Sequence, residues 1–110
     1  MPETSTLKSG TASHVGRQFG PRYLALPEHR WGRPGILVRI CGPAACITRR
    51  STDAGPDKAM QRAGRVADLS FRDFMRVAGV REGEPDPGLV RVTVDYAPAL
   101  LPPTDSEEKP

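Results

Sequence analysis

The sequence predicts an all-β domain with one short α-helix. Glycine and proline are frequent, with 11 and 12 residues in a chain of 110, which is typical of short strands joined by many turns. The segment LVRVTVDY at 89–96 alternates strictly between two faces, as a half-buried strand does. One clear helical pattern of apolar residues covers two turns at 71–78.

A single folded unit is expected to span residues 10–100. The chain length allows one domain with a core large enough to fold alone. Residues 1–9 are polar, and the segment 101–110 is rich in proline and charge. Both ends are therefore expected to be disordered flanks.

Four short strands are predicted in the first half of the chain. Weak alternation over 10–16 indicates a first strand, and residues 23–26 suit a second strand before a loop broken by prolines. The β-branched segment ILVRI at 36–40 is the clearest strand. The segment CITRR at 46–50 returns along it after the connection 42–45, so a hairpin is predicted there.

A short strand at 65–70 is predicted to lead directly into the helix. Ser70 suits the N-cap position, and Asp73 three residues later gives a variant of the capping box. Gly79 stands where a glycine commonly ends a helix. The helix presents one apolar face, of which the middle two side chains should be buried; the face consists of Phe71, Phe74, Met75 and Ala78.

The two cysteines flank the predicted hairpin turn. As cross-strand neighbours, Cys41 and Cys46 could lie within disulfide distance. Two interpretations stay open: a disulfide formed in an oxidising compartment, or two reduced, half-buried thiols. His14 and His29 lack the spacing of zinc ligands, and nothing places either beside a thiol, so both are expected to be surface or packing residues. No metal and no cofactor is expected.

The positive net charge favours an anionic polymer as the binding partner. The net charge is +3, and 13 of the 16 basic residues are arginine, which suits either nucleic acid or an acidic wall glycan. Aromatic residues make up only 5% of the chain, without the basic–aromatic pattern of single-strand nucleic-acid binders, so nucleic acid is the weaker hypothesis. No apolar run approaches membrane-spanning length, and the first ten residues contain no hydrophobic segment of a signal peptide.

Two acids bracket a loop rich in Gly, Lys and Arg. From local chemistry, Asp53 before Ala-Gly-Pro is a turn residue, and Asp68 before Leu-Ser is an N′ or N-cap residue. Trp31 is either a sugar-stacking platform or a loop anchor over the core. The arginines around the acids form either a solvated basic face or a clamp for anionic groups; they are Arg49, Arg50, Arg62 and Arg65.

The order of several short motifs carries a resemblance to a known family. The segment DAGP at 53–56 is similar to an Asp-Arg-Gly-Pro motif, and RVADLS at 65–70 to Arg-Val-Ile-Asp-Leu-Ser. GTASHVG at 10–16 is similar to Gly-x-Ala-Ser-Trp-Tyr-Gly, ALP at 25–27 to a Leu-Pro before a central hairpin, and GLVRVTV at 88–94 to a closing strand. In this order they resemble the rare lipoprotein A (RlpA) and expansin/barwin group. The resemblance implies a small six-stranded double-psi β-barrel with one short α-helix.

The resemblance also implies an activity on polysaccharide walls. RlpA-like proteins include lytic transglycosylases that cleave peptidoglycan strands, and expansin-like proteins loosen walls without hydrolysis. If the roles of the family's acids apply to the matching positions, Asp53 would be the general acid/base and Asp68 a second carboxylate of the groove. An acid in a partly desolvated groove can protonate the leaving oxygen while a hydroxyl of the sugar itself attacks. Substrate-binding residues expected beside them are Tyr23, Trp31, Arg50 and Arg65.

Departures from the family pattern support an alternative. Tyr23 stands where RlpA-like enzymes carry a histidine, Ala54 replaces the Arg of Asp-Arg-Gly-Pro, and a long insert with its own acid is nearly absent. The alternative is a non-catalytic glycan-binding or structural module, for example in a phage tail or a secreted assembly. In either case we expect a monomer whose partner is peptidoglycan or a related polysaccharide, located outside the cytoplasm in the periplasm, the cell wall or a virion.

Overall fold

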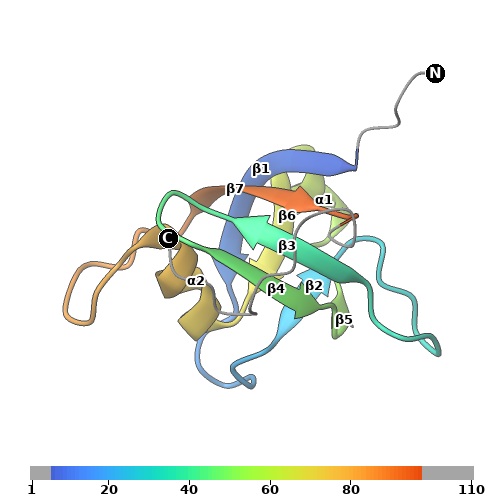
Figure 1. Ribbon diagram of the computed structural model, residues 1–110, viewed down its shortest axis with the longest axis horizontal. Helices are drawn as coiled ribbons and strands as arrows, with labels where there is room; N and C mark the ends of the chain where they lie inside the picture. Colours follow the sequence, from blue (N-terminus) through green and yellow to red (C-terminus); the bar gives the residue numbers. More distant parts are fainter. Residues whose placement is uncertain (1–5, 98–110) are drawn as a thin grey trace.

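Over residues 6–97, which the computed structural model describes, seven strands form one curled sheet (Figure 1). The predicted all-β class is confirmed. Two details of the prediction are wrong, because the described part has seven strands instead of six and two short helices instead of one. In chain order the elements are β1 (Leu7–His14), β2 (Leu24–Leu26), β3 (Leu37–Cys41), β4 (Cys46–Arg50), β5 (Asp53–Ala54), α1 (Lys58–Arg62), β6 (Arg65–Leu69), α2 (Phe71–Ala78) and β7 (Val90–Asp95).

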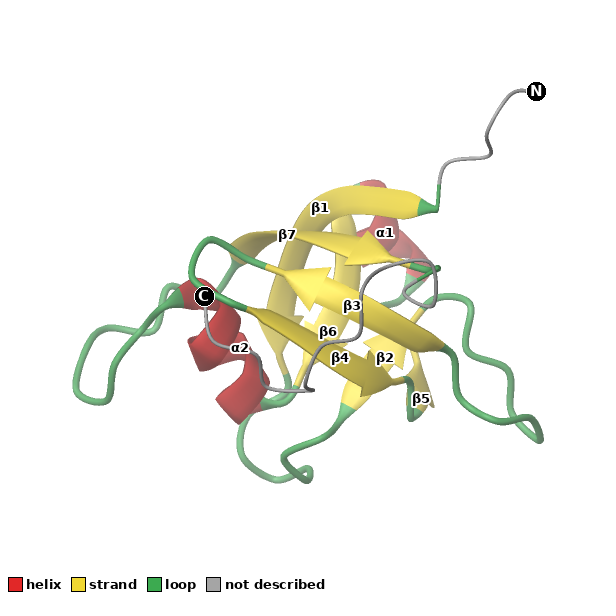
Figure 2. Cartoon of the chain, in the orientation of Figure 1, coloured by secondary structure: helices red, strands yellow, loops and turns green. Residues whose placement is uncertain are grey.

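The order of the strands explains why the sheet curls. In the order β4-β3-β7-β1-β6-β2-β5, the two edge strands are β4 and β5. These two strands are consecutive in the chain, with Ser51 and Thr52 alone between them. Ser51 N donates to Ile36 O at 2.8 Å, and Thr52 N donates to Leu24 O of β2 at 2.8 Å. The two residues that connect β4 to β5 are therefore hydrogen-bonded to the segment before β3 and to β2. The sheet must therefore curve to bring its edges together, and Figure 2 shows β4 ending beside β5.

The hairpin predicted over 36–50 is confirmed. β3 and β4 pair in antiparallel register along their whole length, with Cys41 opposite Cys46 at the end that leads into the turn. A disulfide joins these two cysteines, so they are not the two reduced thiols of the second interpretation. The turn rests on the end of α2, where Ala44 N donates to Val77 O at 3.0 Å.

Helix α2 begins and ends as its sequence predicts. Ser70 is the N-cap, and its hydroxyl accepts from Asp73 N at 3.0 Å. Gly79 ends the helix in the left-handed region, with φ of 76°, which favours glycine. Phe74 is fully buried as predicted. Met75 is only half-buried, contrary to the prediction, because it faces a hollow between α2 and the loop that follows it.

The N-terminal boundary of the fold lies earlier than predicted. β1 begins at Leu7 and pairs antiparallel with β7, with Leu7 opposite Asp95. Residues 7–9 therefore belong to the sheet and were wrongly assigned to a disordered flank. The expectations for residues 1–5 and 98–110 lie outside the described residues.

Helix α1 falls in a segment that was predicted to be loop. Asp57 caps its first turn, with Oδ1 accepting from Met60 N at 2.9 Å. The helix buries none of its side chains, so its sequence has no apolar face by which it could be recognised. Within residues 6–97, neither helix is both long and apolar enough to span a lipid bilayer.

The core lies inside the curl of the sheet and is closed at one end by α2. β7 shows the predicted alternation, since Val92 and Val94 are buried while Arg91 and Thr93 are exposed. Phe74 and Val77 of α2 pack against strand residues of the same cluster. The other fully buried members include Ala12, Leu24, Leu26, Val38, Ile40, Ile47, Ala67 and Leu69.

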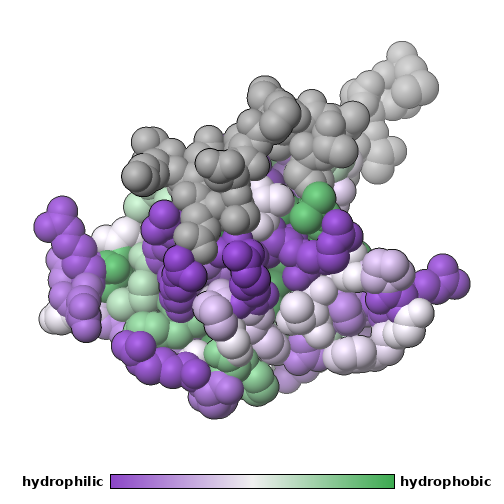
Figure 3. All heavy atoms as spheres, turned by 60° about the horizontal axis from the view of Figure 1, so that its bottom comes forward, coloured by the Kyte–Doolittle hydropathy of each residue, from purple (hydrophilic) through white to green (hydrophobic). Residues whose placement is uncertain are grey.

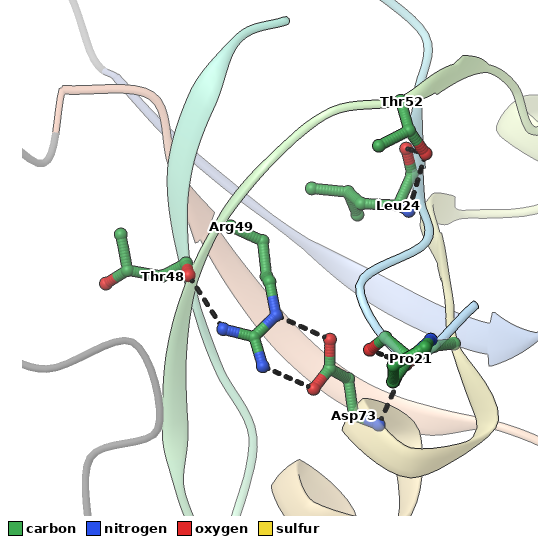
Figure 4. Close-up of polar contacts among 7 residues, drawn as sticks. Pro21, Leu24, Thr48, Arg49, Thr52 and Asp73 are labelled. Carbon is green, nitrogen blue, oxygen red and sulfur yellow. Dashed lines mark hydrogen bonds and ion pairs between the residues drawn. The ribbon is translucent and has the colours of Figure 1, made fainter.

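A buried ion pair fixes α2 to β4 (Figure 4). Arg49 donates through Nε and Nη2 to the two carboxylate oxygens of Asp73, each at 2.9 Å, and through Nη1 to Thr48 O. Both charged side chains are almost fully buried. Burial raises the pKa of the Asp73 carboxyl, and the Arg49 guanidinium opposes that rise. Both interpretations of Arg49, as part of a solvated basic face or of a clamp for anionic groups, are wrong, because its side chain is buried against Asp73.

Candidate functional site

Asp53 and Asp68 lie in one row across the sheet. Asp53 of β5 and Asp68 of β6 are both in register with Ala25 of the intervening strand β2. Asp68 is also in register with Ser13 of β1. The four residues Ser13, Asp68, Ala25 and Asp53 therefore form a continuous row over β1, β6, β2 and β5, which we call the carboxylate row.

The carboxylate row faces away from the core. The strand neighbours Ala12, Ala67 and Leu69 point into the core, and alternate residues of a strand point to opposite faces. Neighbouring strands lie about 4.8 Å apart, so the backbones of the two acids are separated by roughly 10 Å. Both acids are half-buried. The strand register therefore sets both acids on one face of the sheet, on either side of β2.

Tyr23 lies between the two acids. Its hydroxyl donates to Asp53 Oδ2 at 2.7 Å. Burial raises the pKa of the Tyr23 hydroxyl, and the hydrogen bond to Asp53 and the charges of Asp53 and Asp68 raise it further. The Phe19 ring stacks on the Tyr23 ring, with 4.8 Å between centroids. Tyr23 is thus a fixed hydrogen-bond donor that keeps its proton at neutral pH.

Asp53 accepts from two protein donors. Besides the Tyr23 hydroxyl at Oδ2, Oδ1 accepts from Ala54 N at 2.8 Å. Asp53 thus bonds its neighbour's backbone, as a turn residue would, while it also occupies the short strand β5. A carboxylate oxygen has about two acceptor positions, so each Asp53 oxygen retains capacity for a further donor such as a sugar hydroxyl.

Asp68 is held by a serine and an arginine. Asp68 Oδ1 accepts from Ser13 Oγ at 2.7 Å, and Arg65 Nη1 donates to the same Ser13 oxygen at 2.9 Å. Arg65 Nη1 lies 3.8 Å from Asp68 Oδ1. The local interpretation of Asp68 as a helix cap is wrong, since Asp68 belongs to β6 and Ser70 caps the helix. Sequence reasoning missed Ser13, although it lies within the GTASHVG segment that carries part of the resemblance.

Trp31 and Arg50 make their contacts in another region. Trp31 is 68% exposed and lies edge-on to His29, with 4.8 Å between ring centroids. The interpretation of Trp31 as an anchor over the core is therefore wrong. Arg50 Nη1 donates to Gly35 O at 2.9 Å and so holds the loop 27–36. The structure brings together Tyr23, Arg65 and the two acids, and places Trp31 and Arg50 beside this loop.

Both histidines are packing residues, as the sequence predicts. His29 is buried, and its Nδ1 forms a 2.6 Å hydrogen bond with Ser51 Oγ. His14 lies edge-on to the rings of Phe71 and Phe74, at 5.0 Å from each centroid. Within residues 6–97, no three His, Cys, Asp or Glu side chains lie together in a group that could hold a metal ion.

The surface beside the carboxylate row is hollowed next to Phe19. One hollow is lined by the loop that contains Arg17, Phe19 and Pro21 and by the start of α2. A separate hollow lies beside Trp31, between Arg30, Arg33 and Pro34. The row and the first hollow together present hydroxyl, carboxylate, guanidinium and aromatic groups, which suit a polar, hydroxyl-rich ligand. Comparison of the chain with protein-family models, with curated proteins and with solved structures finds no match.

Proposed function

We propose that this protein acts on the glycan strands of a cell wall and binds them across the carboxylate row. The proposal includes a double-psi topology for the curled sheet, in line with the motif resemblance. The observation that carries it is the shared register of Asp53 and Asp68 with Ala25, which sets two half-buried carboxylates on one outward face. A sugar polymer presents hydroxyls along its whole length, and the row offers two carboxylates, with backbones roughly 10 Å apart, that can accept from them.

Asp53 is the proposed general acid/base. In an intramolecular transglycosylation, the glycosidic carbon–oxygen bond breaks and a new bond forms from the same carbon to a hydroxyl oxygen of the same sugar. The proton of that attacking hydroxyl passes to Asp53 and is delivered to the leaving oxygen, so no water is consumed. No second nucleophile is needed from the protein, unlike in the two-carboxylate hydrolases.

Tyr23 orients Asp53 in this proposal. It occupies the position of the family histidine, and its hydroxyl donates to Asp53 Oδ2. Because the pKa of Tyr23 is raised, the tyrosine keeps its proton and remains a hydrogen-bond donor to Asp53. Asp68, with Ser13 and Arg65, would bind hydroxyls of the neighbouring sugar.

The enzymatic proposal is tested by product analysis. Purified peptidoglycan glycan strands are incubated with the wild type and with Asp53→Asn, and mass spectrometry is used to detect anhydro-sugar ends. General acid/base groups contribute about 10²–10⁴-fold, so the variant should form at least about 100-fold less product. Absence of product from the wild type, or equal product from both proteins, refutes the catalytic role.

The non-catalytic alternative is also favoured by a specific observation. Asp53 already has a protein donor at each oxygen, one of them a tyrosine where the enzymes carry a histidine. In this case the carboxylate row binds glycan without cleaving it. Co-sedimentation with insoluble peptidoglycan, no release of soluble sugar, and weaker sedimentation of Asp68→Asn would support this alternative.

A further inference from the structure

Two neighbouring hollows form one groove along α2. The first lies between the loop 16–21 and the start of the helix, and the second between the helix and the loop 80–86. Both are lined by Arg17, Phe71 and Arg72, so they adjoin at these residues. We call these two adjoining hollows together the α2 groove. The roles proposed above for Asp53, Tyr23 and Asp68 use none of its lining residues, although its first hollow adjoins the carboxylate row at Phe19.

Arg17 lies where the two hollows of the α2 groove adjoin, stacked on the ring of Phe71. Its guanidinium carbon lies 4.0 Å from the centroid of the Phe71 ring. The ring of His14 packs edge-on against Phe71 and fixes it in place. Within the described part of the chain, Arg17 has no hydrogen bond or ion pair, and its side chain is exposed. A guanidinium stacked on an aromatic ring keeps its N–H edge free, which suits a carboxylate that binds with both oxygens.

The far wall of the α2 groove is acidic. It carries Glu82, Glu84 and Asp86 on the loop after the helix. His14 of β1 holds this wall, because its Nε2 is bonded to Asp86 Oδ2 at 2.6 Å. The other ring nitrogen, Nδ1, accepts from Gly16 N. The hydrogen bond from His14 lowers the pKa of the Asp86 carboxyl. Asp86 is thus held against β1, at the end of the loop that carries Glu82 and Glu84.

Glu82 is the carboxylate of this wall that is left for a ligand. Asp86 accepts from Gly88 N and Glu84 accepts from Arg81 N, whereas among residues 6–97 Glu82 has no such partner. The side chains of Phe71, Met75 and Val80 add apolar surface to the lining of the same hollow. In Figure 3 the loop at the left is largely hydrophilic, and hydrophobic surface lies beside it.

We propose that the α2 groove binds the peptide part of peptidoglycan, as a short peptide with free carboxylates and one free ammonium group. A peptide carboxylate pairs with Arg17, the ammonium group pairs with Glu82, and the small aliphatic side chains lie on the apolar floor. This inference rests on the proposed function, since the occupant must be attached to the glycan. The geometry supports that link, because Phe19 at the head of the groove stacks on Tyr23, which in turn bonds Asp53.

The proposal is tested with a soluble peptide that lacks any sugar. Isothermal titration calorimetry measures binding of a synthetic stem pentapeptide that contains a diamino acid with a free amino group. Arg17→Gln should weaken binding at least tenfold, and the matched control Arg91→Gln, an exposed arginine of β7, should leave it unchanged. Glu82→Gln should weaken binding of the free peptide but not of a peptide whose amino group is acetylated. Raised salt should weaken wild-type binding.

Two results would overturn the proposal: no binding of the peptide to the wild type, or equal losses in Arg17→Gln and Arg91→Gln. The Asp53→Asn variant and peptide-free glycan strands separate this proposal from the proposed function. If peptide-free strands bind while the pentapeptide does not, the α2 groove is not a peptide site and the carboxylate row stands. If the pentapeptide binds with equal affinity to wild type and Asp53→Asn while the strands neither bind nor react, the proposed function fails and the groove stands.

Discussion

Two arginine–aspartate pairs in this protein have the same chemistry and different surroundings. Arg49 and Asp73 are almost fully buried and meet through two hydrogen bonds between β4 and α2. Arg65 and Asp68 are half-buried, lie 3.8 Å apart and share the hydroxyl of Ser13. The first pair is closed off from solvent and its groups bond to other protein groups, so we expect it to act within the fold. The second leaves acceptor and donor positions exposed, so it can bind a ligand.

The largest expected effect comes from one substitution made in the buried pair. Asp73→Asn leaves the Arg49 guanidinium buried without a charged partner, and breaking such a pair costs about 3–5 kcal/mol. The free energy of unfolding from urea denaturation should fall by this amount. A loss below about 1 kcal/mol would mean that the pair is solvated and that the comparison between the two pairs does not hold.

A substitution in the core beneath α2 should lower the free energy of unfolding by a similar amount. Phe74 is fully buried on the same helix, so Phe74→Ala should lower the free energy of unfolding by about 3–5 kcal/mol through the cavity it creates. Met75→Ala, at a half-buried position one residue later, serves as the control and should cost less. Equal losses at the two positions would contradict the orientation of α2 described above.

The same Asp→Asn substitution in the half-buried pair should separate stability from binding. Asp68→Asn keeps an oxygen that accepts from Ser13, and partly exposed ion pairs contribute about 1 kcal/mol or less. Urea denaturation should therefore show little change. Sedimentation with peptidoglycan should weaken, and unchanged sedimentation would remove Asp68 from the proposed site.

Glu28, a half-buried acid away from both pairs, gives the smallest expected effect and a dependence on pH. Burial acts to raise the pKa of Glu28, but hydrogen bonds from Lys8 and Tyr96 outweigh it and lower the pKa. A lowered pKa in the folded state gives stability that is present above the unfolded value, about 4.3, and is lost as the pH falls through the folded value. Glu28→Gln should reduce the loss of stability between pH 5 and pH 3 by about 1 kcal/mol or less. Denaturation midpoints at both pH values measure this, and an identical pH dependence in the variant would contradict it.

Local rules were sufficient for the features that depend on neighbours in sequence. The alternation of β7, the hairpin of β3 and β4, and the Ser70 cap of α2 were all predicted from residues close together in the chain. Helix α1 was missed because it buries no side chain, and a two-residue strand such as β5 has no periodicity to detect.

The candidate site was predictable only in part, because its hydrogen bonds join residues that are distant in sequence. The motif resemblance supplied Asp53 and Asp68, and the two acids do lie on one face. Their hydrogen-bond partners depend on the register of strands distant in sequence, since Ser13 and Asp68 are 55 residues apart and Tyr23 and Asp53 are 30 apart. Periodicity within a segment carries no information about such pairs. The same holds for Arg49, whose burial follows from the packing of α2 on β4.

The central claim is that Asp53 does chemistry on glycan while Asp73 only stabilises the fold. It is tested most directly by measuring anhydro-sugar product and the free energy of unfolding on the same preparations of wild type and Asp53→Asn. We expect the variant to unfold within about 1 kcal/mol of the wild type and to form at least about 100-fold less product. A stable Asp53→Asn protein that forms as much product as the wild type would contradict the claim.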